Sequence, residues 1–163
     1  MNRLLPFTLA LAVTALAAPA IVAAGTAESG VTVSNPAGAC QSALPVYEDL
    51  IRKRPLATQN EGKRTAFVTC AMVSGGGVIE VLLYLAGTET TPRAVSCTAV
   101  AGYNTGPAQY LTKTAMVTGD AQTSLRWENS EFPEQDLGSR FAVSCALPPG
   151  TSVNDYTLSW VNY

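Results

Sequence analysis

The sequence contains no histidine. Without an imidazole the chain has no Ser-His-Asp triad, no Cys-His dyad and no histidine-ligated zinc or copper site. No two of its cysteines form a CxxC pair, and no GxSxG motif is present. An enzyme made from this sequence would depend on carboxylate pairs, on lysine or tyrosine chemistry, or on a metal held by oxygen ligands. We therefore predict a protein that is not an enzyme and has no cofactor.

Charge is also scarce. Charged residues make up 13% of the chain, the net charge is −2, and hydrophobic residues make up 47%. This balance excludes nucleic acid as a partner, because the phosphate backbone requires a basic face. The apolar content is too high for a disordered chain. We expect one folded domain.

The N-terminal segment has the three parts of a secretory signal peptide. A short positive region ending at Arg3 precedes an uncharged stretch, Leu4–Ala24, that ends in small residues. We predict cleavage after Ala24 and a secreted or periplasmic protein with no membrane span in its mature chain. Residues 1–24 are then the signal peptide, 25–39 a flexible lead rich in small residues, and 40–163 a β-sandwich domain.

The four cysteines all lie in the exported part, where an even number indicates disulfides. They allow three connectivities, and spacing alone does not choose between them. Three of them sit in similar strand-like segments in which the cysteine shares one face with apolar neighbours. We predict Cys40–Cys70, which would tie the lead to an early strand, and Cys97–Cys145, which would join two core strands.

The remaining pattern predicts an all-β fold. Segments of alternating or continuous apolar residues recur about every 10–15 residues with Gly or Pro at most joints, which is typical of an antiparallel sandwich. We expect seven or eight strands, Ig-like or jelly-roll-like. Residues 78–86 are nearly all apolar, which suits a strand buried on both faces or a central strand. Prolines restrict the region near residues 42–52 to a short helical turn.

Acidic residues cluster after the strand expected at residues 123–127. Oxygen ligands in a loop are suited to Ca²⁺, and paired carboxylates are suited to glycoside hydrolysis. The cluster has no DxDxDG pattern and is interrupted by Phe132-Pro133, so we interpret it as a solvated loop. The candidates are Glu128, Glu131, Glu134 and Asp136. The basic residues at 52–54 and 63–64 are interpreted in the same way, as a solvated surface.

Aromatic residues give the best argument for a binding module, since sugar-binding sandwiches use exposed aromatic faces as stacking platforms. The candidates are Trp127, Tyr103 and Tyr110. Tyr156, Leu158 and Trp160 share one face of a strand, and we interpret this row as core.

Several segments are similar to small secreted, cysteine-containing β-domain proteins of Gram-negative bacteria to which no function is assigned. The similarity lies in Ile51–Leu56, Gln59–Gly62, Ala66–Cys70 and Cys145–Gly150 and extends over most of residues 40–155. It implies an exported, cysteine-containing β domain and transfers no functional residue.

The sequence therefore predicts a non-enzymatic binding or structural module with protein, cell-surface or glycan contacts, and does not identify the partner. Two alternatives stay open. One is a small hydrolase that depends on carboxylates or a metal. The other is a carbohydrate-binding, pilus-like or adhesin-like surface subunit.

Overall fold

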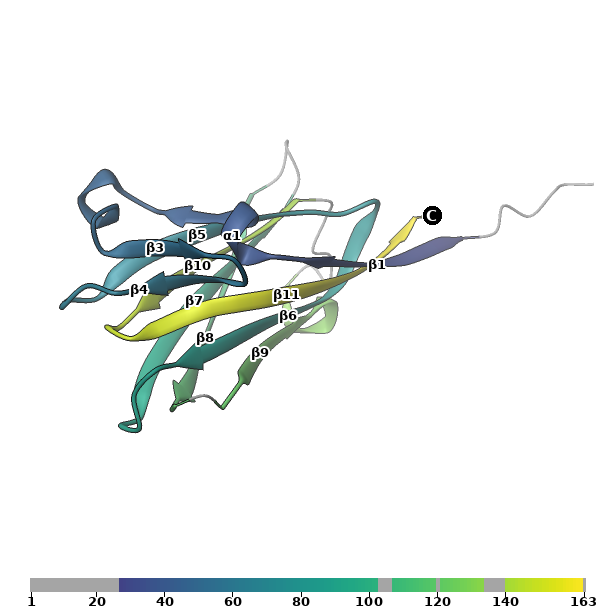
Figure 1. Cartoon of the computed structure of the whole chain (residues 1–163). Coiled ribbons are helices and arrows are strands. Elements are labelled where there is room, and N and C mark those ends of the chain that lie inside the picture. The colour runs from purple at the N-terminus through teal and green to yellow at the C-terminus, as the bar shows by residue number, and fades with distance from the viewer. Residues whose placement is uncertain (1–26, 103–106, 120, 134–139, 163) are drawn as a thin grey trace, which may run out of the picture.

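Two antiparallel sheets pack face to face to form a β-sandwich (Figure 1). The computed structural model describes residues 27–102, 107–119, 121–133 and 140–162. The first sheet has the order β3 (Ile51–Arg54), β4 (Ala57–Asn60), β11 (Thr151–Asn162), β6 (Gly77–Gly87) and β9 (Thr123–Glu128), with β1 (Glu28–Ser34) also beside β11. The second has the order β2 (Cys40–Ser42), β5 (Ala66–Val73), β10 (Arg140–Leu147), β7 (Arg93–Gly102) and β8 (Gln109–Val117).

Period-two alternation of apolar residues builds the core between the sheets. On β5, β7 and β10, every second side chain is buried and its neighbours point outward. Strand β6 lies between β11 and β9, which confirms the central position predicted for residues 78–86. The row formed by Tyr156, Leu158 and Trp160 packs into or against the core, as predicted.

Side chains close the seam between the long edge strands β8 and β9. The indole of Trp127 is fully buried and donates its Nε1–H to the carbonyl of Leu111 at 3.1 Å. Nearby, the ammonium of Lys113 on β8 donates to the backbone carbonyl of Arg126 on β9. These bonds give hydrogen-bond partners to two backbone carbonyls at the seam, one on each strand.

Both disulfides have the predicted partners, Cys40–Cys70 and Cys97–Cys145, with Cα–Cα distances of 3.9 and 4.0 Å. Each joins residues that are directly opposite in neighbouring strands, β2–β5 and β7–β10. All four cysteines are buried and point from the five-stranded sheet into the core between the two sheets. Two disulfides fit a protein of the periplasm or the extracellular space.

The N-terminal region is more regular than predicted. The flexible lead predicted for residues 25–39 is corrected, because β1 pairs with β11 over residues 28–34 and the short helix α1 (Pro36–Ala39) follows. The predicted helical turn is present as a single 3₁₀ turn, η1 (Pro45–Tyr47). Four strands before residue 66 (β1 to β4) raise the number of strands in the described residues above the seven or eight expected.

Asn60, at the end of β4, links the turn between β4 and β5 to the turn between β10 and β11. Its Nδ2 donates to the carbonyls of Arg64 (2.9 Å) and Leu147 (2.7 Å), and its Oδ1 accepts the N–H of Gly62 (2.9 Å). Its backbone carbonyl accepts the N–H of Gly150 at 2.9 Å. Gly150 has a φ of +74°, which glycine adopts without strain in the tight turn between β10 and β11. The predicted turn at Asn60–Gly62 is thus organised by a buried amide.

In the part of the chain that the structure describes, no helix is both long and apolar enough to cross a bilayer.

Candidate functional site

The outer face of the five-stranded sheet carries rows of small hydroxyl groups. Strand pairing places Thr69, Ser144, Thr98 and Thr112 side by side across β5, β10, β7 and β8. Neighbouring strands are about 4.8 Å apart, so these side chains form an evenly spaced row. The Oγ1 atoms of Thr98 and Thr112 are hydrogen-bonded at 2.8 Å. This hydrogen bond orients the two side chains toward each other. Each hydroxyl can still exchange a further hydrogen bond with solvent or a ligand.

The described residues of this face carry little charge. The outward positions of the four long strands carry hydroxyl, aliphatic and aromatic side chains, and among these described positions Arg140 is the single charged residue. The positions are Phe67, Thr69, Ala71, Val73, Ala94, Ser96, Thr98, Val100, Gly102, Tyr110, Thr112, Thr114, Met116, Arg140, Ala142, Ser144 and Ala146. A solvated sheet face ordinarily mixes charges of both signs, so this composition favours a contact surface.

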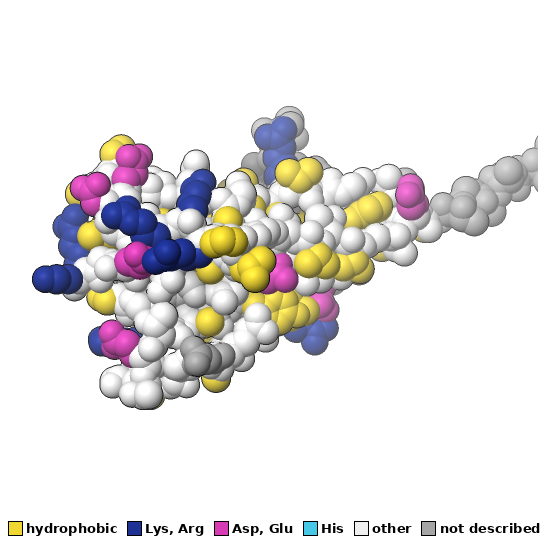
Figure 2. Space-filling view, in the orientation of Figure 1, with side chains coloured by type: hydrophobic (Ala, Val, Ile, Leu, Met, Phe, Trp, Pro, Cys, Tyr) yellow, Lys and Arg dark blue, Asp and Glu magenta, His cyan; other side chains and the backbone are white. Residues whose placement is uncertain are grey.

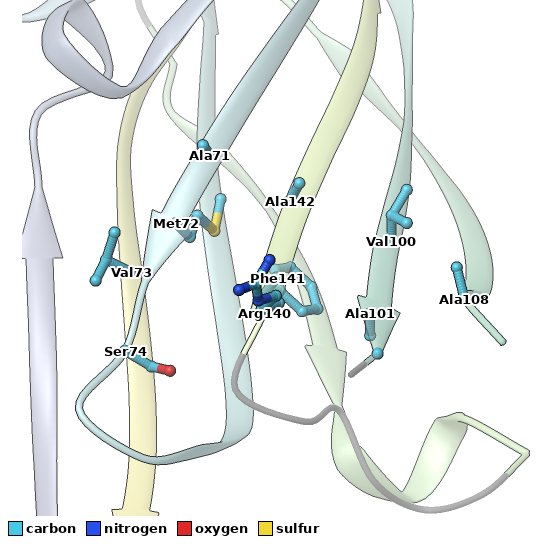
Figure 3. Close-up of a pocket in the computed structure, with 11 residues that line it drawn as sticks. Ala71, Met72, Val73, Ser74, Val100, Ala101, Ala108, Arg140, Phe141 and Ala142 are labelled. Carbon is cyan, nitrogen blue, oxygen red and sulfur yellow. The ribbon is translucent and has the colours of Figure 1, made fainter. Parts of the chain in front are cut away.

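A hollow of about 610 Å³ opens at one end of the same face (Figure 3). The ends of β5, β7 and β10 line it, and Ala71, Ala142 and Gly102 leave it open because their side chains are small or absent. Val73, 77% exposed, and Arg140 stand at its margin. Among the described residues, the lining of the hollow is mainly apolar with one cation, a combination suited to a ligand that has both apolar and polar faces.

The structure separates the three aromatic candidates. Tyr110 is 68% exposed and stands beside Val100, which lines the hollow. Trp127 is fully buried in the β8–β9 seam, so its indole is not a surface platform, and this corrects its place among the candidates. Tyr103 lies outside the described residues. Tyr110 is therefore the candidate that the structure places on a surface.

The acidic candidates in the described residues are engaged in local contacts. Glu131, in the 3₁₀ turn η2 (Asn129–Glu131), accepts from the Lys113 ammonium at 2.6 and 2.7 Å and from the N–H of Glu128 at 2.9 Å. The hydrogen bond from Lys113 is the main cause that lowers the pKa of Glu131, with partial burial opposing it. Glu134 and Asp136 lie outside the described residues.

Two carboxylates do converge on the outer face of the other sheet. Glu80 and Glu128 are directly opposite on β6 and β9, and both contact the guanidinium of Arg126 beside a hollow of about 380 Å³. The hydrogen bond to Glu80 is the main cause that raises the pKa of Arg126. A glycosidase pair needs one carboxyl that donates a proton, whereas here a cation occupies the carboxylates as acceptors. The arrangement is that of an ion-pair cluster.

No three acidic, histidine or cysteine side chains come close enough to hold a metal ion within the described ranges.

The basic residues at 52–54 also have a place in the fold. They form most of β3, the edge strand at one end of the six-stranded sheet, and all three are exposed. Figure 2 shows basic side chains gathered at this end of the molecule. Charged side chains on an edge strand oppose pairing with another chain, which gives this group a structural role beyond solvation.

Sequence reasoning missed the hydroxyl rows and Arg140. The signal was present, because Thr69, Ser96 and Ser144 alternate with core residues in their strands. The alternation within one strand does not show how neighbouring strands are aligned, so the rows across the sheet could not be predicted from it.

No protein-family model matches the chain, and no curated protein matches it. Among solved structures, it is similar to an exo-β-1,3-galactanase from Phanerochaete chrysosporium (16% identity, TM-score 0.44, 79% of this chain and 29% of that one). It is also similar to the CBM36-1 domain of a multidomain xylanase from the hindgut metagenome of Trinervitermes trinervoides (10%, 0.43, 80% and 96%). A third match is a family 11 carbohydrate-binding module from Clostridium thermocellum (8%, 0.39, 83% and 85%).

The chain spans less than a third of the galactanase chain and of a Podospora anserina mannanase chain that it also matches. At these identities and TM-scores, the similarities assign neither a family nor a ligand to this protein.

Proposed function

We propose that this protein is a non-catalytic module that binds a glycan on the outer face of its five-stranded sheet. The observation that carries the proposal is the combination on one face of an exposed Tyr110, rows of hydroxyl groups and a mainly apolar hollow with a single cation. A sugar ring has an apolar face that stacks on an aromatic ring and hydroxyls that exchange hydrogen bonds with Ser and Thr.

The positions of these groups suit an extended ligand. Tyr110 on β8, Val100 on β7 and Ala142 on β10 form one row across the strands, about 10 Å long over two strand spacings, and Arg140 lies two residues further along β10. A chain of sugars lying across the strands would contact the tyrosine, the floor of the hollow and the arginine in turn. A ligand that needed a deep enclosed pocket would not be matched by this open surface.

The test is titration of the protein with a panel of soluble polysaccharides, followed by calorimetry with the best ligand. We expect Tyr110→Ala to weaken binding about tenfold, which corresponds to about 1.4 kcal/mol, because the stacking face is lost. Leu56→Ala is the control, because Leu56 is 74% exposed and lies outside the strands of this sheet. Equal affinity of wild type and Tyr110→Ala, or no binding to any polysaccharide, would contradict the proposal.

A further inference from the structure

The edge strands of the two sheets are protected unequally. Strand β3 is covered with charge by Arg52, Lys53 and Arg54, and β2 is only three residues long. The edges of β8 and β9 that face each other are covered by side chains, and Trp127 and Lys113 each donate a hydrogen bond to a carbonyl of the opposite strand. Charge, shortness and side-chain cover are three ways in which natural sheets prevent pairing with another chain.

Strand β1 has none of these protections. It is seven residues long, and among the described residues it pairs with β11 alone. Its one charged residue is Glu28, at its first position. The strand lies along β11 and extends toward the C-terminal end of the structure (Figure 1). The backbone groups on its outer edge have no strand partner in the described chain, although the strand is long enough to accept one.

The orientation of β1 is fixed from the core side. The aromatic ring of Trp160 lies directly against Gly30 and also against the backbone of Gly75, so that a methyl group at either glycine would overlap the indole. Because the Gly30 face of β1 packs against Trp160, the other face of the strand points to solvent. Val31 and Val33 are each 64% exposed on that face. Figure 2 shows hydrophobic side chains gathered over β1 and its neighbours.

We infer that β1 is a docking edge for β1 of a second copy of this chain, paired antiparallel so that the two six-stranded sheets become continuous. The strand is self-complementary when the two-fold axis passes through Thr32. Val31 of each copy then faces Val33 of the other, and two Val–Val pairs form on the outer surface. The two Glu28 side chains lie at opposite ends of the ladder, so no like charges meet.

In this pairing the outward faces of the two β1 strands coincide, and so do the inward faces. Valines meet valines on the outward face, and glycine and serine meet on the inward face, where Gly30 would be opposite Ser34. An isologous contact of this kind closes after two copies and does not propagate into a fibre. It also leaves the outer face of the five-stranded sheet free, so it is independent of the proposed glycan site.

Sedimentation equilibrium of the chain secreted by an expressing bacterium tests the inference, with concentrations up to about 0.5 mM to detect weak association. Wild type is expected to form a dimer. The variant Val31→Lys/Val33→Lys places lysine opposite lysine and is expected to be monomeric. The variant Val31→Lys/Val33→Glu places lysine opposite glutamate in both pairs and is expected to restore the dimer.

Val46→Lys is the control, since Val46 is 56% exposed and distant from β1 in sequence, within η1. It is expected to dimerise as wild type does, and circular dichroism checks that each variant folds. A wild type that stays monomeric throughout the concentration range overturns the inference, even if it binds a foreign strand peptide. A dimer that survives in the double-lysine variant overturns it as well. A double variant with opposite charges that remains monomeric overturns the proposed register.

Discussion

Replacing Asn60 tests how much of the stability depends on one buried amide. The side chain is fully buried and makes three hydrogen bonds, to the carbonyls of Arg64 and Leu147 and from the N–H of Gly62. Each bond contributes about 1 kcal/mol net, and its loss leaves a backbone group without a partner. We expect Asn60→Ala to lower the free energy of unfolding by about 3 kcal/mol, a large share of the 5–15 kcal/mol typical of a domain.

Asn60→Asp makes the test sharper because it keeps the shape of the side chain. At neutral pH a carboxylate would replace the amide donor and face the carbonyl oxygens of Arg64 and Leu147, which repel it. We expect this variant to be less stable than Asn60→Ala at pH 7, with the difference shrinking in acid as the carboxyl becomes neutral.

The assay is urea unfolding with both disulfides intact, with the slope compared between variants to exclude changes in the unfolded state. Gln59→Ala is the matched control, because Gln59 is the neighbouring β4 residue on the opposite, half-exposed face. It is expected to change stability by less than about 0.5 kcal/mol. A loss below about 1 kcal/mol for Asn60→Ala, or an aspartate variant as stable as wild type at pH 7, would refute the reasoning.

Two further predictions concern covalent and electrostatic links. Replacing both Cys97 and Cys145 with alanine removes a bridge that closes a loop of 48 residues. We expect the free energy of unfolding, measured in urea, to fall by about 4 kcal/mol. An unchanged urea midpoint would contradict this prediction. Lys113 lowers the pKa of Glu131 from its usual value of 4.5. The ionised Glu131 side chain therefore stabilises the fold above pH 4.5, and this stabilisation is lost as the pH falls through the lowered pKa. The stability difference between wild type and Glu131→Gln should therefore be constant above about pH 5 and shrink toward pH 3, whereas Glu89→Gln, at an exposed ion pair, should show little difference at either pH. An equal Glu131→Gln effect at pH 6 and pH 3 would rule out this linkage.

Local alternation predicted the strands that cross the core. The strands predicted at residues 78–86 and 123–127 agree with β6 and β9 to within one residue at each end, because each strand has one face in the core. The disulfide partners were also predicted, since three cysteines were placed facing inward and Cys40 was expected to tie the N-terminal lead to an early strand.

The N-terminal strand was missed because its sequence is poor in the residues that form strands. Glu28–Ser34 contains serine, glycine and glutamate, and only Val31 and Val33 alternate in the usual way. Its strand structure comes from pairing with β11 and from the contact of Gly30 with Trp160, which is 130 residues away in the chain. A contact at that separation is a property of the fold and has no local signature.

The candidate site was predictable only in part. Exposure of Tyr110 and burial of Trp127 depend on which strand lies at the β8–β9 seam, and both residues occur in similar alternating segments. The hydroxyl rows require the register of four strands, which come from positions far apart in the sequence. Such surfaces emerge from tertiary pairing, and a single sequence shows only their components.

Both disulfides connect strands within one sheet, and this has a mechanical consequence. The load on a chain pulled from its N-terminal end would first reach β1, whose ladder to β11 can open one hydrogen-bonded pair after another. The load would then pass through α1 to Cys40, where the bridge to Cys70 transfers it directly to β5. The five-stranded sheet would bear tension covalently at that point. The two sheets, in contrast, are joined to each other by side-chain packing, chain connections and side-chain hydrogen bonds such as those of Trp127 and Lys113. The five-stranded sheet is therefore cross-linked covalently, whereas the six-stranded sheet can yield under load.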